Sequence, residues 1–409
     1  MKEVVSDVVV IGAGPAGAVA SALLVQRGWK VSVVERQEFP RFSIGESLLP
    51  QCMEFLERAD MLEAVKSAGF QFKNGAAFER DGERTAFDFN DKFSPGHGTT
   101  FQVQRAAFDK ILADEAERQG AEIHYRHSIR EADINEEGVR LLAECDGEEV
   151  IFRGRFVLDA SGFGRVLPRL LKLDRPSDFP ARESVFTHVQ DNISDAQFDR
   201  NKILITVHPQ QRDIWYWLIP FSGGRASLGV VGDSRKISVL GDSPEQILRR
   251  AVEEAPELSK TLRDAEFDTP VQKISGYASD VTSLTGPGFA LLGNAGEFLD
   301  PVFSSGVTIA MKSAQLASDC LHRQLGGESV DWQAEFAEPL KHGVDVFKTY
   351  VTAWYDGRFQ DVIFHRTGQT EIKRMICSIL AGYAWDKNNP YVAGAERRLN
   401  TLAEICAAS

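Results

Sequence analysis

The chain has 409 residues, with 46 Lys and Arg against 59 Asp and Glu, which leaves a formal net charge of −13. This acidic balance argues against a general nucleic-acid binder, because such proteins gain affinity by neutralising phosphates. The hydrophobic fraction of 43% and the charged fraction of 26% are typical of globular proteins and exclude disordered and fibrous classes. At roughly 100–200 residues per domain, the length predicts two or three domains.

The sequence contains no apolar run of the ~18 residues that a membrane-spanning helix requires, and residues 1–7 lead directly into a predicted strand rather than a signal sequence. We therefore expect a cytoplasmic protein that does not associate with membranes. The five cysteines are widely spaced and form no CxxC motif, so neither a disulfide framework nor a zinc site is expected. The eight histidines form no HxH or HExxH pattern, and we assign no metal.

The first part of the chain predicts a β-α-β unit: an apolar strand at 7–11, a glycine-rich turn at 12–17, a small-residue helix at 18–27 and a second strand at 31–35. A loop at 39–50 follows. Apolar periodicity and alternation then predict helices at 53–59, 62–68 and 106–120, a hairpin at 75–89, and strands at 122–125, 139–144 and 156–159. This order of elements indicates an α/β domain of the dinucleotide-binding type.

The pattern changes to alternating strands between about residues 184 and 274, which indicates a sheet domain. The elements expected there are strands at 203–208, 214–219 and 226–231 and a charged helix at 244–254. A buried strand at 289–292 and a long helix from 304 to about 325 restore the α/β pattern. The predicted boundaries are 1–74, 98–182 and 280–330 for a discontinuous dinucleotide-binding domain, 75–97 and 183–279 for the sheet domain, and 331–409 for a helical C-terminal region.

The turn at 12–17, GAGPAG, has the spacing GxGxxG of a dinucleotide fingerprint. Gly12 permits a tight turn, Gly14 lets the backbone approach a pyrophosphate, and Gly17 allows helix and strand to pack closely. The N–H groups at the start of the helix suit phosphate oxygens. Glu35, at the end of the next strand, would accept hydrogen bonds from the hydroxyls of an adenosine ribose. The alternative, a glycine-rich turn without a ligand, is disfavoured by the strand-turn-helix context.

Three further segments indicate which dinucleotide is bound. Residues 104–112 open a helix with an arginine, residues 159–162 end a strand as Asp-Ala-Ser-Gly, and residues 293–301 precede the long helix as Gly-Asn-Ala-Gly-Glu-Phe-Leu-Asp-Pro. With the fingerprint, this set resembles the flavoprotein monooxygenases of the hydroxybenzoate hydroxylase fold. The resemblance implies an α/β fold class, in which a Rossmann-like FAD-binding domain is interrupted by a β-sheet substrate domain and followed by a helical C-terminal tail. Asn294 stands where that family usually has Asp, and it can still accept a hydrogen bond.

The segment at 215–220, Trp-Tyr-Trp-Leu-Ile-Pro, matches the WxWxIP motif of flavin-dependent halogenases at every specified position. Residues 39–50, 70–76 and 300–307 resemble, in that order, the loop beneath the flavin, the catalytic-lysine segment, and the flavin and halide segment of the same family. The likeness covers roughly residues 5–320. It is nearest to the branch that acts on phenols and carrier-bound pyrroles, since tryptophan halogenases place Glu where this chain has Phe303.

The resemblance to halogenases implies roles for individual residues. Lys73 is the expected catalytic residue, and the substrate and halide site is expected at Trp215, Trp217, Ser304, Ser305 and Gly306. The residues expected to bind FAD are Gly12, Gly14, Pro15, Ala16, Gly17, Glu35, Arg36, Arg41, Ser47, Arg105, Asp159, Gly162, Asn294, Asp300, Gly306 and Val307. Arg105 would contact the phosphates, Asn294 would meet the ribityl chain, and Asp300 would approach the pyrophosphate and the flavin ring.

These residue types suit halogenation chemistry. Reduced flavin and O2 generate an electrophilic oxygen donor that hydroxylates a nearby arene, unless halide intercepts the oxygen and a wall keeps the arene away. Trp215 and Trp217, at i and i+2 of a strand, project to one face and could supply that wall. Backbone N–H groups at Ser305 and Gly306 suit a halide, and Lys73 could hold hypohalous acid or become a haloamine. The simpler alternatives are a core tryptophan pair, an N-cap serine pair and a solvated surface lysine.

No second GxGxxG follows the first, so no resident NAD(P)H domain is expected. We predict a two-component, FADH2-dependent halogenase of secondary metabolism that uses O2 and a halide ion to halogenate an electron-rich aromatic, free or tethered to a carrier protein. A separate flavin reductase is the expected partner. The alternatives are an aromatic hydroxylase on the same fold, an ene reductase resembling geranylgeranyl reductases, and a non-catalytic flavin-binding module.

Overall fold

The structure is a computed structural model that describes residues 2–195, 198–365 and 370–408. Its α/β part is built on a six-stranded sheet with the strand order β20-β21-β12-β2-β3-β8, in which every neighbouring pair except β20–β21 is parallel. The strands are β2 (Val8–Ile11), β3 (Val31–Val34), β8 (Glu122–His124), β12 (Phe156–Asp159), β20 (Thr285–Gly286) and β21 (Phe289–Leu291). The central strands are buried at every residue, as expected for a parallel sheet that is covered on both faces.

Helices cover this sheet, and α1 packs between two of them. The helices of this part are α1 (Pro15–Val25), α2 (Gln51–Arg58), α3 (Leu62–Ser67), α4 (Arg105–Gln119), α5 (Val166–Leu170) and α9 (Gly306–Leu325). α1 contacts both α4 and α9, because its alanines and glycine allow close approach. The expected start of the long helix at 304 is wrong by two residues: Ser304 has a left-handed φ of +56°, which cannot continue a right-handed helix.

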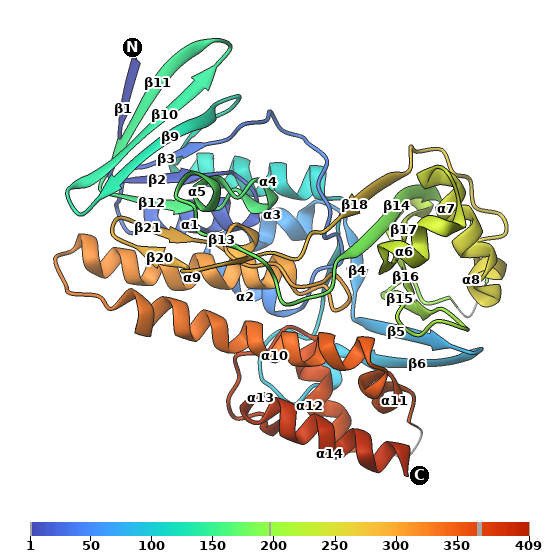
Figure 1. The fold of residues 1–409 in the computed structure, drawn as a ribbon. Coiled ribbons are helices and arrows are strands. Elements are labelled where there is room, and N and C mark those ends of the chain that lie inside the picture. Colours follow the sequence, from blue (N-terminus) through green and yellow to red (C-terminus); the bar gives the residue numbers. More distant parts are fainter. Residues whose placement is uncertain (1, 196–197, 366–369, 409) are drawn as a thin grey trace.

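A second sheet of four strands, β1-β11-β10-β9, packs on the first sheet (Figure 1). Its strands are β1 (Lys2–Val5), β9 (Ser128–Asn135), β10 (Gly138–Cys145) and β11 (Glu148–Gly154). The sequence predicted only β10. Short two-stranded ladders join β4 (Gln71–Lys73) to β7 (Thr100–Gln102), and β13 (Asp174–Arg175) to β19 (Asp280–Val281).

The third large sheet has seven strands in the order β18-β14-β17-β16-β15-β5-β6, and only the pair β15–β5 is parallel. These strands are β5 (Gly75–Arg80), β6 (Glu83–Asp88), β14 (Arg182–Gln190), β15 (Lys202–Val207), β16 (Trp215–Pro220), β17 (Arg225–Asp233) and β18 (Gln272–Ser275). One face is covered by α6 (Ser234–Ile237), α7 (Pro244–Glu253) and α8 (Pro256–Thr261), as the right side of Figure 1 shows. The other face joins the main hydrophobic core.

The C-terminal part is helical and packs beneath the two larger sheets (Figure 1). It contains α10 (Glu338–Tyr355), α11 (Arg358–Phe364), α12 (Thr370–Leu380), α13 (Pro390–Ala393) and α14 (Ala395–Ala407). Among the described residues, no helix combines the length and the apolar character needed to cross a bilayer. The fold class predicted from the sequence, α/β with an interrupting sheet and a helical C-terminal tail, is confirmed.

Candidate functional site

A cavity of about 530 Å³ is lined by residues from all three large sheets and from the start of α9. Most of the residues predicted to form the site meet in its walls. They are Gly12, Gly14, Pro15, Ala16, Glu35, Arg36, Arg41, Ser47, Arg105, Gly162, Trp215, Trp217, Asn294, Ser304, Gly306 and Val307. The structure places five other predicted residues behind the walls: Gly17, Lys73, Asp159, Asp300 and Ser305.

The glycine-rich turn between β2 and α1 forms one end of the cavity. Gly12 has a φ of +95°, and a Cβ atom there would lie 2.7 Å from the carbonyl oxygen of Ala160, so only glycine fits. A Cβ atom on Gly17 would lie 1.9 Å from the carbonyl oxygen of Gly12, which explains the close approach of helix and strand. Gly14 is the N-cap of α1 and has no side chain to cap it. The N-terminal N–H groups of α1 are therefore available to an anion.

Glu35, at the end of β3, has a buried carboxylate beside this turn. Its Oε2 atom accepts a hydrogen bond from the backbone N–H of Ala13 at 2.9 Å, and Oε1 accepts one from Gln37 at 2.9 Å. These bonds orient the carboxylate and leave it further lone pairs. Glu35 is thus held where it can accept hydrogen bonds from ribose hydroxyls.

Two arginines share one buried carboxylate near the turn. Asp109 is fully buried and accepts hydrogen bonds from Nε and Nη2 of Arg105, at 2.7 and 3.0 Å, and from Nη1 of Arg41, at 3.1 Å. Both arginines line the cavity. One carboxylate for two guanidinium groups leaves a net positive charge, which favours phosphate binding.

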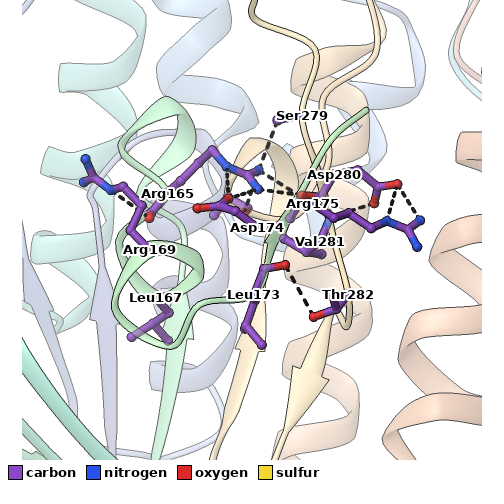
Figure 2. Close-up of polar contacts among 12 residues, drawn as sticks. Arg165, Leu167, Arg169, Leu173, Asp174, Arg175, Ser279, Asp280, Val281 and Thr282 are labelled. Atoms are coloured by element: carbon purple, nitrogen blue, oxygen red, sulfur yellow. Dashed lines mark hydrogen bonds and ion pairs between the residues drawn. The ribbon is translucent and has the colours of Figure 1, made fainter. Parts of the chain in front are cut away.

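The turn after β12 is shaped by Asp159 and tied to the loop before α9 by Arg165. Asp159 accepts backbone hydrogen bonds from Ser161 at 2.9 Å and Leu167 at 2.7 Å, so it organises the turn rather than facing the cavity. The Arg165 guanidinium donates to the carbonyl oxygens of residues 294–296 at 3.0–3.3 Å. Figure 2 shows the same side chain reaching Ser279 and the Asp280 backbone. Arg165 therefore holds the loop that places Asn294 in the cavity wall.

Trp215 and Trp217 lie on the same face of β16 and line the cavity, while Tyr216 packs into the core on the opposite face. The centres of the two rings lie 6.0 Å apart, and both residues are buried, with exposed fractions of 1% and 4%. The Trp217 Nε1–H donates to Ser227 Oγ at 3.0 Å. Its ring lies over Gly229, where a Cβ atom would approach it to 2.3 Å. The tryptophans thus form a fixed apolar wall.

Asp300, in the segment before α9, lies behind this wall and is connected to it through Tyr355. Burial raises the pKa of Asp300 to about 6, while the hydroxyl of Tyr355 and the backbone N–H of Val302 donate to its carboxylate. Ser304 and Gly306 line the cavity, whereas Ser305 is buried behind them. Ser305 occupies the N-cap position of α9, as the alternative of an N-cap serine pair expects, but its side chain makes no capping hydrogen bond.

Lys73, the last residue of β4, is only 1% exposed, so the alternative of a solvated surface lysine is wrong. Its Nζ donates to Ser47 Oγ and to the Leu48 carbonyl oxygen, both at 2.7 Å. Within the described ranges, no carboxylate forms an ion pair with it. Desolvation therefore dominates and lowers the pKa of Lys73 to about 7. Ser47 also lines the main cavity, so this residue connects the amine to that cavity.

A second cavity of about 10 Å³ adjoins Lys73, which is roughly enough for one water molecule. Its walls are mostly apolar and include Phe78, Phe89, Phe303 and Leu380. Ile203 and Ser304 line both cavities. The amine is thus enclosed by hydrophobic side chains on the side away from Ser47.

Sequence reasoning missed several polar residues of the site. Asp109 could have been found, since it lies four residues after Arg105 on a predicted helix, the spacing of an ion pair. Glu46, whose Oε1 lies 2.6 Å from Nε2 of His188, also lines the cavity. For Glu46, Arg165 and Tyr355 no local pattern exists, because their partners are far away in the sequence.

The walls fit a flavin dinucleotide. A helix N-terminus and two arginines suit the pyrophosphate, and the Glu35 carboxylate suits a ribose. Trp215, Trp217 and neighbouring aliphatic side chains supply an apolar surface for an aromatic ring system.

Comparison with known proteins agrees with this fit. The FAD binding domain family matches residues 5–284. A tryptophan 2-halogenase of Chondromyces crocatus is 30% identical over 79% of this chain, and the match spans 62% of the length of that relative. A 1H-pyrrole-2-carbonyl peptidyl-carrier protein brominase of Pseudoalteromonas luteoviolacea is also 30% identical, over 81% of this chain and 80% of its own. Among solved structures, a flavoprotein/dehydrogenase of Cytophaga hutchinsonii is 44% identical, with a TM-score of 0.96 over 99% of both chains.

Proposed function

This chain belongs to the flavin-dependent halogenase family of FAD-binding proteins, and from that premise we propose that it is a two-component halogenase. The protein is an FAD-dependent oxidoreductase. The proposed reaction uses FADH2 from a separate reductase, O2 and a halide ion, and halogenates a phenol or pyrrole, free or bound to a carrier protein. The observation that carries this proposal is the buried amine of Lys73, which lies one serine hydroxyl away from the cavity.

The residues of the main cavity bind and orient the cofactor in this proposal. The α1 N-terminus, Arg41 and Arg105 hold the pyrophosphate, Glu35 the adenosine ribose, and Asn294 the ribityl chain. Bound FADH2 supplies the electrons that, with O2 and halide, give hypohalous acid. Trp215 and Trp217 keep the organic substrate away from the flavin, so direct hydroxylation is disfavoured.

Lys73 receives the oxidised halogen. Because its pKa is about 7, a large fraction of the amine is uncharged at neutral pH and has a free lone pair. A neutral amine can hold hypohalous acid by a hydrogen bond or form an N–halogen bond with release of water. Ser47, hydrogen-bonded to Nζ, holds the amine at the boundary of the main cavity.

The small space beside Lys73 constrains how the aromatic substrate arrives. A volume of about 10 Å³ cannot hold a phenol or pyrrole ring. The substrate must therefore displace side chains such as Phe89 and Leu380, which come from the segment after β6 and from α12. In this proposal, substrate selection depends on the C-terminal helices as well as on the seven-stranded sheet.

The test is Lys73→Met, assayed with chemically reduced FAD, air, bromide and a phenolic probe. We expect FAD binding and FADH2 oxidation close to wild type, while bromination of the probe falls by about 10²–10⁴, the range for loss of a positioned acid or base. Lys92→Met is the matched control. Lys92 is 8% exposed, donates to the Gly96 carbonyl oxygen, and has a pKa lowered by burial. Full bromination by Lys73→Met would contradict the proposed role.

A second candidate is an FAD-dependent dehydrogenase or ene reductase, which the enclosed position of Lys73 and the Cytophaga hutchinsonii structure favour. Such an enzyme transfers a hydride and a proton between flavin and a carbon–carbon bond and needs no halide. Anaerobic oxidation of FADH2 by an activated alkene, together with no halogenation of phenols, pyrroles or indoles by the wild type, would favour it.

A further inference from the structure

A chain of three hydrogen-bonded side chains connects the tryptophan wall to the C-terminal helices. Nε1–H of Trp215, on β16, donates to the hydroxyl oxygen of Tyr355 at 2.9 Å. Tyr355 is the last residue of α10, and its O–H donates to Oδ2 of Asp300 at 2.8 Å. Oδ1 of Asp300 accepts from the backbone N–H of Val302 at 3.0 Å.

The direction of this chain is determined by its chemistry. An indole nitrogen can only donate, so the Tyr355 oxygen must accept from Trp215 and has its single proton left for Asp300. Trp215 and Asp300 are buried, with exposed fractions of 1% and 3%. The guanidinium carbon of Arg182 lies 3.6 Å from the centre of the Tyr355 ring and holds it from the other side. The phenol therefore has one orientation in which all three groups are satisfied.

We infer that Tyr355 is a positioning residue that fixes the Trp215 indole relative to the segment from Asp300 to Gly306. Tyr355 thereby sets the separation between the main cavity and the small cavity beside Lys73. This inference rests on the proposed function, since the separation matters only if oxidant made in the main cavity must reach Lys73 before it is lost. Loss of the Tyr355 hydroxyl removes both bonds at once and lets the indole rotate. The tryptophan wall then separates the two cavities less completely, and more of the electrons from FADH2 reduce O2 to hydrogen peroxide.

The matched pair of variants is Tyr355→Phe and Tyr350→Phe. Tyr350 lies on the same helix, is fully buried, and donates to the Tyr391 carbonyl oxygen at 3.1 Å. Its variant therefore loses one oxygen and one buried hydrogen bond that involves neither Trp215 nor Asp300. We expect peroxide formed per FADH2 oxidised to rise by roughly twofold or more in Tyr355→Phe, the scale of coupling within one hydrogen-bond network. Tyr350→Phe should match the wild type, and both should bind FAD.

A double-mutant cycle with Trp215→Phe shows whether Tyr355 acts through the indole. The readout is tryptophan fluorescence of the protein without FAD, which does not depend on the reaction. Tyr355→Phe should change the emission in the wild-type background and leave it unchanged in the Trp215→Phe background. An equal change in both backgrounds would overturn the inference.

The pH dependence of this emission is the further check. The ionisable side chains that interact with Asp300 include Tyr355 on α10, Arg182 at the start of β14 and Tyr277 after β18. Burial raises the pKa of Asp300 to about 6. Protonation below that pH weakens the acceptor, so the Trp215 emission should change with a midpoint near pH 6. In Tyr355→Phe this transition should be lost. If the wild type forms no hypohalous acid but the fluorescence cycle behaves as expected, the proposed function fails and the positioning role stands. If Tyr355→Phe shows an unchanged peroxide yield together with normal halogenation, the positioning role alone is refuted.

Discussion

Single residues of this site differ in how their buried charges are compensated. Asp109 lies between two guanidinium groups, so its charge is paired. Lys73 is equally buried and has a hydroxyl and a carbonyl oxygen as partners. Neutral acceptors compensate a positive charge poorly at low dielectric, and the amine therefore gives up its proton more easily. The same burial that lowers the pKa of Lys73 makes this residue costly for the fold.

We predict that this cost appears as a pH dependence of stability. The pKa of Lys73 is lowered from 10.5 to about 7, so between these values the unfolded chain binds a proton that the folded protein does not. The free energy of unfolding must then rise with pH in that window and reach a constant penalty below about pH 7. Between about pH 7.5 and pH 9, the wild type should gain about 2 kcal/mol relative to Lys73→Met. Denaturant unfolding of both proteins at the two pH values measures this difference.

The control for this measurement is Lys66→Met. Lys66 is exposed and pairs with Glu63, one turn away on α3. Its variant should show the same pH dependence as the wild type. A wild-type curve parallel to that of Lys73→Met would mean that the amine keeps its proton in the folded protein.

Among the elements, β16 places the two tryptophans of the candidate site, and the start of α1 places Pro15 and Ala16. Both faces of β16 are buried, one in the main core with the tryptophans and one under α7 with Tyr216. The start of α1 presents N–H groups at the end of β2, because the turn between them contains glycines where side chains would collide. Changes in these two elements should separate cofactor binding from product control.

At α1 we predict that Gly14→Val folds and loses FAD. A Cβ atom at Gly14 would lie 3.4 Å from the Arg41 guanidinium, an ordinary contact, and the backbone is not left-handed. The added methyl groups would occupy the place of the pyrophosphate, so affinity should fall by at least about 100-fold, or about 3 kcal/mol. Gly12→Ala should instead destabilise the fold itself. FAD titration and thermal unfolding distinguish the two effects, and tight FAD binding by Gly14→Val would contradict the placement of the pyrophosphate.

At β16 we predict that Trp217→Phe weakens the wall without unfolding the sheet. The variant loses ring volume and the bond to Ser227, a cost of about 1–2 kcal/mol. Hydroxylated product or peroxide should increase relative to halogenated product. Trp385→Phe is the control, because Trp385 also donates to one acceptor, the Pro339 carbonyl oxygen, and packs on a glycine, Gly343. Equal product ratios in the two variants would argue against a separating wall at Trp217.

At the scale of the whole molecule, the residues that the structure describes form three hydrophobic cores, and the largest one joins the α/β part, one face of the seven-stranded sheet and the C-terminal helices. The C-terminal helices contact the surroundings of the site: Tyr355 on α10 is hydrogen-bonded to Trp215 and Asp300, and Leu380 on α12 lines the small cavity beside Lys73. In the proposed function, substrate access and the geometry of the wall therefore depend on a region that carries none of the sequence motifs.

At this scale we predict that electrons come from outside the chain. The sequence has a single GxGxxG turn, and the cavity at that turn is the proposed FAD site. The purified protein alone should oxidise NADPH negligibly, and a flavin reductase should restore turnover. Absorbance at 340 nm, the nicotinamide band, follows this directly. Fast NADPH oxidation that is stimulated by a phenol would instead indicate a single-component hydroxylase.

The sequence by itself determined the features that depend on neighbours in the chain. The fingerprint at 12–17, the alternation at 215–220 and the buried strand at 156–159 are local patterns, and they predict the fold class, the cofactor and the common face of the two tryptophans. Lys73 could be singled out only through resemblance, because one lysine in a short segment has no periodicity.

The tertiary structure alone decided the features that need contacts between distant segments. β1 forms only because β11, almost 150 residues later, supplies its parallel partner. The burial of Lys73, the sharing of Asp109 and the link from Trp215 through Tyr355 to Asp300 likewise join elements far apart in the chain. A side chain's pKa and orientation depend on what surrounds it in space, and the local pattern contains no information on those partners.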